Sequence, residues 1–402
     1  MTNVNKKKQC GYRKKQKKYR LLLALIFIVL KGLFPASSKA QKLQKGFTSH
    51  TENHLENNIS LNVRELARIL KESCLQKAQT GLRVVSLKTG NTLYDHRKDD
   101  LFIPASNVKL ITTAAALSRL GARYTFQTNA YTDGKWQDSK LDGNLYIEGR
   151  GDPELVSERL WLIARDVKSR GLKIIAGNLV ADESYFDDQR WGKGWPRQTG
   201  YQAYYAKISA LSLNFNTVAV HVEPALKIGQ PARVTVEPPT DYTRLVNLTQ
   251  TRKINRRSAQ NKLIVDRIED PNGDQIVVSG VVPFMAKKKI IYRNISNPPM
   301  YFAQTFKKFL SREGVKVKGQ VVKGKIPSNA SLFATYSYKP LFSIVQDLNK
   351  LSNNFIAEQI LKTMGAELKG IPGTTAGGLE VVSEFLEDLG IAPQSYRLVD
   401  GS

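Results

Sequence analysis

A serine and a lysine that could act as a nucleophile and its base lie three positions apart, at Ser106 and Lys109. On a helix, side chains at positions i and i+3 share a face, so the hydroxyl and the amine can meet. Pro104 suits the first turn of a helix that continues to Leu120. Burial and the partial positive charge of a helix N-terminus both disfavour an ammonium, so Lys109 could act as a general base. The backbone N–H of Ser106, unpaired in a first turn, could stabilise an oxyanion.

A Ser-x-x-Lys pair is a weak signal by itself, because a basic chain of this length produces one by chance. Ser106 and Lys109 form the single such pair in the sequence. The alternative is structural, with Ser106 as a helix cap and Lys109 as a solvated side chain of the first turn. A second motif far along the chain favours the catalytic interpretation.

Ser352 and Asn354 form that second motif, a Ser-x-Asn triplet in a polar turn before an amphipathic helix. The hydroxyl could relay a proton between Lys109 and a leaving amine, and the amide could hold a substrate carbonyl. Ser212 and Asn214 have the same spacing but lead into a strand-like run. We therefore favour Ser352 and keep Ser212 as the alternative.

With these motifs the chain resembles the class C low-molecular-mass penicillin-binding proteins, which are periplasmic D-alanyl-D-alanine carboxypeptidases and endopeptidases. The similarity runs from about residue 61 to residue 402. It is carried by Phe102-Ile103-Pro104-Ala105-Ser106-x-x-Lys109, Gly149-Arg150-Gly151-Asp152-Pro153, Ser209-Ala210-Leu211-Ser212-x-Asn214, Leu351-Ser352-Asn353-Asn354 and Asp400-Gly401-Ser402. The resemblance implies Ser106 as the acyl-enzyme nucleophile, Lys109 as its base, and Ser352 and Asn354 as partners. It also implies peptidoglycan stem peptides as substrates and β-lactams as covalent inhibitors.

The resemblance implies an α+β fold, in which a serine β-lactamase/DD-peptidase-like catalytic domain is interrupted by a large β-rich insert. The 246 positions between Ser106 and Ser352 leave room for whole inserted domains. Apolar periodicity and turn residues predict catalytic sequence at 61–128 and 294–402. The insert, 129–293, is predicted to hold two small β-rich modules.

The family's third motif, Lys-Thr-Gly on a strand beside the site, does not follow Ser352. Lys362-Thr363 comes closest, inside the helix predicted after Asn354. Lys88-Thr89-Gly90 matches literally but precedes the nucleophile and lies in a predicted β-hairpin turn, so we interpret it as a coincidence. The family continues beyond Asp-Gly-Ser, which favours a C-terminally truncated catalytic domain here. The alternative function is an inactive envelope protein that at most binds peptidoglycan.

Residues 1–40 have the pattern of a secretory signal peptide. The first 20 residues carry nine Lys or Arg and no acidic residue, and an apolar run follows. That run is too short to span a bilayer comfortably, which favours cleavage after Ala40 over an uncleaved anchor. Residues 41–60 are predicted to be a flexible lead-in. We therefore expect export to the periplasm or cell envelope.

The formal charge of +26 suggests an anionic partner, but more than a third of it belongs to the leader. No zinc-finger or helix-turn-helix pattern accompanies the remainder, so we expect no nucleic-acid partner. Attraction to anionic envelope polymers, or peripheral contact with a membrane surface, is the better use of this charge.

Cysteine and histidine spacing indicates neither a disulfide nor a metal site. Cys74 is the one cysteine outside the leader, so no intramolecular disulfide is expected. The four histidines are scattered without ligand spacing, and we expect no metal or other cofactor. With no suitable histidine, the base has to be lysine.

A glycine-rich aromatic loop begins at Trp191 and contains Trp195. The pattern favours a loop packed on its own tryptophans over one that borders the cleft.

Overall fold

The computed structural model describes residues 63–71, 78–195, 200–253, 262–271 and 273–402. The chain divides into two compact units, Met1–Ile103 and Pro104–Ser402, and each is described by itself. The predicted signal peptide, the lead-in at 41–60 and Cys74 lie outside the described residues. Among the residues that are described, no helix has both the length and the apolar content needed to cross a membrane.

The first unit contains a helical segment at 63–70 and the predicted hairpin. Strands β1 (Leu82–Val85) and β2 (Thr92–His96) pair antiparallel. Gly90 takes φ +75° in their connection, where its N–H donates to the carbonyl of Ser86 at 2.8 Å. Lys88 lies in this turn and not on a strand, as predicted, and its side chain is exposed.

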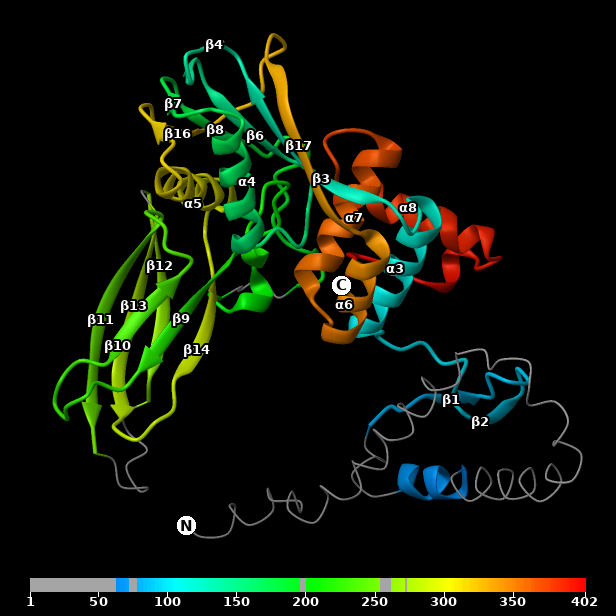
Figure 1. Ribbon diagram of the computed structural model, residues 1–402. Helices are drawn as coiled ribbons and strands as arrows, with labels where there is room; N and C mark the ends of the chain where they lie inside the picture. The colour runs from blue at the N-terminus through cyan, green and yellow to red at the C-terminus, as the bar shows by residue number, and fades with distance from the viewer. Residues whose placement is uncertain (1–62, 72–77, 196–199, 254–261, 272) are drawn as a thin grey trace, which may run out of the picture. The chain divides into compact units, whose positions relative to one another are not determined.

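The helices α3, α6, α7 and α8 of the second unit form one bundle, in which α7 is the central element (Figure 1). Their bounds are α3 Val108–Arg119, α6 Leu341–Leu351, α7 Asn354–Lys369 and α8 Thr375–Asp388. Ala115 of α3, Leu348 of α6, Ile360 of α7 and Val382 of α8 belong to one buried cluster. Every residue of α7 from Phe355 to Ala366 is buried, so the helix is enclosed on all sides.

A five-stranded sheet has the order β16-β8-β6-β3-β17. Its strands are β3 Thr125–Thr132, β6 Leu145–Gly149, β8 Leu179–Asp182, β16 Val321–Lys323 and β17 Ser331–Pro340. β16, β8 and β6 run parallel to one another, and β3 pairs antiparallel with both β6 and β17. Helices α4 (Ser157–Ser169) and α5 (Pro298–Arg312) pack on each other, and α5 contacts β8.

Three smaller sheets complete the second unit. A four-stranded sheet has the order β15 (Lys316–Val317), β7 (Ile174–Ile175), β5 (Lys140–Asp142) and β4 (Lys135–Gln137). Two three-stranded sheets consist of β10 (Arg233–Glu237), β9 (Thr217–Glu223) and β14 (Lys289–Asn294), and of β11 (Thr243–Arg252), β13 (Gly273–Pro283) and β12 (Ile264–Asp270). Val220 of β9 and Ile276 of β13 belong to one buried cluster, as expected for sheets that pack face to face.

The α+β class predicted from the sequence is confirmed. Helices α5 and α6 both lie within the segment 294–402, which the sequence assigns to the catalytic domain. The insert limits of 129–293 remain a prediction. The structure shows in addition that later segments pack with the insert. α5 and the strands β15 to β17, which follow residue 293, join the sheets formed by the insert.

Two adjacent strands connect the five-stranded sheet with the helices. β3 follows α3, β17 precedes α6, and the two strands pair with each other. At the crossing, the N–H of Leu341 donates to the carbonyl of Tyr124 at 2.8 Å. This pairing returns the chain to α3 after more than 200 residues, and it is the reason that residues far apart in sequence can share one site.

Candidate active site

Ser106 lies where an irregular segment becomes a helix. The single 3₁₀ turn Ala105–Asn107 leads directly into α3, with Pro104 just before it. Ser106 is exposed, whereas Lys109, one turn later, is 2% exposed. The predicted helix start is confirmed, and it presents the hydroxyl to solvent beside a buried amine.

Lys109 joins three segments of the chain through its Nζ atom. Nζ donates to Ser106 Oγ at 3.0 Å and to Asn354 Oδ1 at 2.7 Å. It also donates to the backbone carbonyl of Ser402 at 2.8 Å. The structure thus brings Ser106, Lys109 and Asn354 together, although 245 positions separate the last two.

Burial lowers the pKa of Lys109 from its ordinary value, while the negative charges of Glu358 and Asp400 act in the opposite direction. A lowered pKa increases the fraction of neutral amine at neutral pH, which is the form that can accept a proton. The distance from Nζ to Ser106 Oγ is within the reach required of a general base.

Ser352 stands at the junction of α6 and α7 in a left-handed conformation, with φ 55° and ψ 43°. Its N–H closes α6 by donating to the carbonyl of Leu348 at 2.7 Å. Asn353 then caps α7 by accepting from the N–H of Ile356. Ser352 is exposed, so its hydroxyl is open to a ligand. The predicted turn before a helix is confirmed.

The alternative triplet has a structural role. Ser212 is buried, and its hydroxyl donates to the carbonyl of Ser209 at 2.7 Å and accepts from Asn216 at 2.9 Å. Asn214 donates to Ser157 Oγ at 2.7 Å. Because these polar groups already have partners, Ser212 is no substitute for Ser352.

Lys362 and Thr363 lie inside α7, as predicted. Lys362 is fully buried and pairs with Asp187, and its Nζ donates to the carbonyl of Gln189 at 2.9 Å. This lysine therefore fastens the segment before Trp191 to α7.

Residues 400–402 line the site from a third direction. The N–H of Gly401 donates to Glu358 Oε1 at 3.0 Å, and its carbonyl accepts from Thr112 Oγ1 at 2.9 Å. Asp400 Oδ2 accepts from the N–H of Gly194 at 2.8 Å. Trp195 Nε1 donates to the hydroxyl of Ser402 at 2.9 Å, so the aromatic loop borders the site. The interpretation favoured from the sequence, a loop packed only on itself, is wrong here because the indole N–H has a partner outside the loop.

Sequence reasoning missed Glu358. The residue lies one helical turn after Asn354 and is fully buried. An acidic residue in an amphipathic helix is normally expected on the solvated face. The i, i+4 spacing from Asn354 was the signal that could have placed it beside Lys109.

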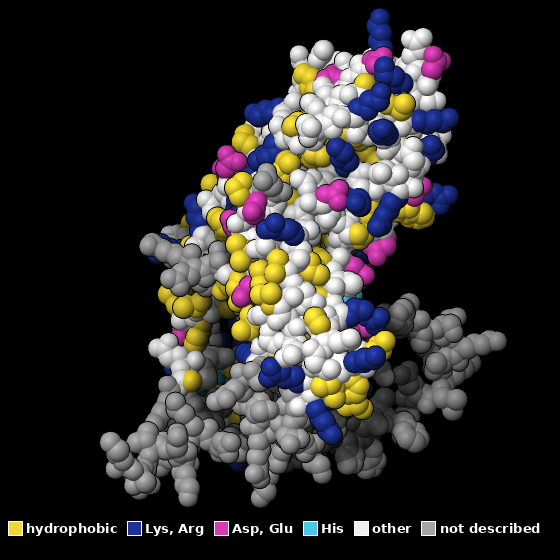
Figure 2. All heavy atoms as spheres, turned by 90° about the vertical axis from the view of Figure 1, so that its left-hand side faces the viewer, with side chains coloured by type: hydrophobic (Ala, Val, Ile, Leu, Met, Phe, Trp, Pro, Cys, Tyr) yellow, Lys and Arg dark blue, Asp and Glu magenta, His cyan; other side chains and the backbone are white. Residues whose placement is uncertain are grey.

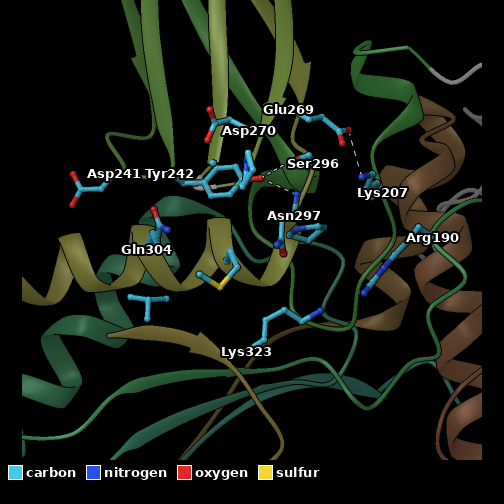
Figure 3. A pocket seen from close by; sticks show the side chains of 15 residues that line it. Arg190, Lys207, Asp241, Tyr242, Glu269, Asp270, Ser296, Asn297, Gln304 and Lys323 are labelled. Carbon is cyan, nitrogen blue, oxygen red and sulfur yellow. Dashed lines mark hydrogen bonds and ion pairs between the residues drawn. The ribbon is translucent and has the colours of Figure 1, made fainter. Parts of the chain in front are cut away.

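A separate cavity of about 810 Å³ lies where α5 meets the ends of the three-stranded sheets (Figure 3). It shares no lining residue with the site around Lys109. Its charged side chains already have partners in the protein: Arg190 and Lys323 pair with Glu183, Lys207 with Glu269, and Asp241 with Lys308. The cavity consequently leaves no unbalanced charge that would select a ligand.

Basic side chains form no single stripe on the face drawn in Figure 2. Lys and Arg are dispersed there among acidic and uncharged residues.

The fold is that of the penicillin-binding proteins. It resembles the crystal structure of penicillin binding protein 4 (dacB) from Haemophilus influenzae, with a TM-score of 0.69 and 24% identity over 80% of this chain and 70% of that chain. A structure of the same protein complexed with a β-lactam matches with a TM-score of 0.64 and 23% identity, over 85% and 72% of the two chains.

The family model described as D-Ala-D-Ala carboxypeptidase 3 (S13) matches residues 62–402. The chain belongs to this family.

Two curated relatives are similar in sequence. The D-alanyl-D-alanine carboxypeptidase of Actinomadura sp. (strain R39) is 34% identical over 347 residues, which is 84% of this chain and 63% of the relative. The D-alanyl-D-alanine carboxypeptidase DacB of Haemophilus influenzae is 24% identical over 343 residues, or 85% and 70% of the two chains. The chain thus spans less than two thirds of the length of its Actinomadura relative.

Proposed function

We propose that this chain is a serine-type D-Ala-D-Ala carboxypeptidase/endopeptidase that acts on peptidoglycan stem peptides. The observation that carries the proposal is the position of Lys109 Nζ. It is buried, and it lies 3.0 Å from the exposed Ser106 hydroxyl and 2.7 Å from the Asn354 amide. Membership of the S13 family and the names of both relatives support the same activity.

In the proposed reaction, Ser106 Oγ attacks the carbonyl carbon of the penultimate D-Ala while its proton passes to neutral Lys109. The carbonyl oxygen becomes an oxyanion, which the N–H of Ser106 stabilises. When the intermediate collapses, the C–N bond breaks and the departing D-Ala amine takes up a proton. Water then attacks the ester carbon, which releases the shortened peptide and regenerates the Ser106 hydroxyl.

The second motif contributes two groups. Asn354 holds Lys109 through its side-chain oxygen, which leaves its NH₂ group available for a substrate carbonyl. Ser352 presents an exposed hydroxyl that can pass the proton between Lys109 and the leaving amine.

β-Lactams are proposed as covalent inhibitors, because the strained amide places a carbonyl carbon where the peptide carbonyl would lie. Ser106 would open the ring and remain acylated. The β-lactam complex of the Haemophilus protein supports this extension. Export by the predicted leader would place the protein in the periplasm or cell envelope, where its polymeric substrate is found.

A labelling experiment tests the proposal. We expect a fluorescent penicillin to mark the full-length protein covalently, Ser106→Ala to abolish the label, and peptide mapping to locate it at Ser106. Ser212→Ala is the matched control, since that serine belongs to the alternative triplet and should leave labelling intact.

Label retained in Ser106→Ala would refute the assignment. A folded wild-type protein that takes no label but binds isolated peptidoglycan would instead support the alternative, an inactive envelope protein.

A further inference from the structure

Glu358 occupies the same face of α7 as Asn354, one turn later, because residues at i and i+4 lie above one another. Lys362 follows after a further turn, and both Glu358 and Lys362 are fully buried. The buried face of α7 thus carries an amide, a carboxylate and an ammonium in succession. Lys362 has a counter-ion in Asp187, and the negative charge of Glu358 also favours the ammonium form of Lys362.

Glu358 holds the segment Asp400–Ser402 in place. Its Oε1 accepts from the N–H of Gly401 at 3.0 Å. Lys109 and Thr112 of α3 bind the same segment from the other side, through the carbonyls of Ser402 and Gly401. The approach is close, since a Cβ on Gly401 would lie 3.1 Å from the Cβ of Leu361.

Lys109 is surrounded by a small set of charged and polar groups. Glu358 and Asn354 face it from α7, Asp400 and Ser402 from the segment 400–402, and Ser106 from the 3₁₀ turn before α3. Glu358 and Asp400 are the two negative groups in this set, and both favour the ammonium form of Lys109.

Asp400 already has partners for both oxygens, which accept from the N–H groups of Gly194 and Ser402. Glu358 is more deeply buried than Asp400. Burial, together with the charge of Asp400, raises the pKa of Glu358 to about 7, while Lys109 acts to lower it. The charge state of Glu358 is therefore linked to that of Lys109 in the neutral range.

We propose that Glu358 is a positioning residue of this site, which holds Asp400–Ser402 against α3 and supplies the buried negative charge that the Lys109 ammonium faces. As a statement about catalysis, the inference rests on the proposed function. It assigns Glu358 no contact with substrate; the residue acts through Lys109.

Glu358→Gln tests the inference, because it keeps an oxygen that can accept from Gly401 and removes the charge. Glu367→Gln is the matched control: it is the same change on the same helix, at a carboxylate that instead accepts from Tyr185 and Arg150. Two readouts are measured in the full-length protein from pH 5 to pH 10. They are the rate of Ser106 acylation by labelled penicillin and the titration of Lys109 followed by ¹³C NMR of labelled lysine.

Loss of a nearby negative charge destabilises the ammonium, so the pKa of Lys109 should fall. We expect both midpoints in Glu358→Gln to move to lower pH by about one unit, a typical effect of one close charge. Glu367→Gln should keep the wild-type midpoints. Equal midpoints in Glu358→Gln and wild type would overturn the inference.

Two further outcomes are separable. If wild type takes no label, the proposed function fails, but the NMR titration of Lys109 still decides the role of Glu358. If Glu358→Gln does not fold, the reciprocal variant Lys109→Met is used, with Glu358 followed by ¹³C NMR of its carboxyl carbon. Removal of the positive charge should raise the pKa of Glu358, and an unchanged value would refute the inference.

Discussion

Ser352 illustrates how a single residue of this site departs from the backbone conformations that non-glycine residues prefer. Its left-handed backbone, with φ 55°, is unfavourable for a residue that has a Cβ, by about 1–2 kcal/mol. Glycine would relieve this strain at the end of α6. A serine retained in such a conformation is consistent with a role for its hydroxyl, because strained residues gather at functional sites.

The first prediction follows from this conflict. Ser352→Gly should leave the free energy of unfolding unchanged or raise it by up to about 1 kcal/mol. It should also slow acylation by about 10²-fold or more, as expected for a lost proton relay. Urea unfolding and the rate of penicillin labelling measure the two effects.

Ser139 provides the control, since it also has a positive φ, of 66°, in the turn between β4 and β5. Ser139→Gly should leave labelling unchanged. Wild-type acylation rates in Ser352→Gly would remove Ser352 from the proposed mechanism.

At this scale the sequence predicted which residues would meet but not what surrounds them. Ser106, Lys109 and Asn354 could be chosen because their types and local spacing match a chemical requirement. The i, i+4 spacing could have placed Glu358 beside Lys109, but not beside the Asp400–Ser402 segment, whose return to α7 no local pattern encodes. The contact of Trp195 with Ser402 could not be predicted for the same reason.

Among the elements, α7 differs most from its sequence pattern. Its apolar spacing predicted a helix with one solvated face, whereas the structure buries Phe355–Ala366 completely. Each polar residue of that stretch therefore needs a partner from another element. Lys362 finds one in Asp187, which joins the aromatic loop to the helix.

The second prediction concerns this buried pair, whose partners are not equivalent. The side chain of Lys362 is fully buried, whereas that of Asp187 is 29% exposed. Asp187→Ala leaves a buried ammonium without its counter-ion and should lower the free energy of unfolding by about 3–5 kcal/mol. Lys362→Met leaves a carboxylate that water can reach and should cost clearly less.

Urea unfolding at pH 7 measures both variants. Lys369→Met, on the same helix but in an exposed ion pair, is the control and should change stability by no more than about 0.5 kcal/mol. Equal losses in Asp187→Ala and Lys362→Met would contradict this account.

For the whole molecule, a buried carboxyl group sets one part of the pH dependence of stability. Burial, with a further contribution from Glu154, raises the pKa of Asp152 to about 6, against an ordinary value of 3.8. The folded protein therefore binds more protons than the unfolded chain between about pH 4 and pH 6. The free energy of unfolding should fall as pH rises through this window, since the stabilisation from the bound proton is lost.

Asp152→Asn should remove this dependence and stabilise the protein above pH 6, by on the order of 2–3 kcal/mol. Its amide oxygen can still accept from the N–H of Glu154, as the carboxylate does at 2.9 Å. Urea unfolding from pH 4 to pH 8 provides the test, with Asp142→Asn, at an exposed residue of β5, as control. Parallel curves for wild type and Asp152→Asn would show that Asp152 does not titrate as described.

For the whole molecule, only part of the fold could be predicted from the sequence. The α+β class, the hairpin before Ser106 and the helices that follow Pro104 and Ser352 could be predicted from the sequence. The position of α5 on β8, and the pairing of β16 with β8, join segments more than 100 residues apart. Such contacts depend on matching surfaces rather than on local propensity, so periodicity could not predict them.

The pairing of β3 with β17 also affects how freely the region between them can change in length. Thr125 lies opposite Pro340, so the ends of this long excursion are fixed side by side. For a loop closed in this way, doubling its length costs only about 0.6 kcal/mol in closure entropy. Outlying strands such as β10 to β12 could therefore be lengthened, shortened or exchanged over evolution while Ser106 and Asn354 keep their separation.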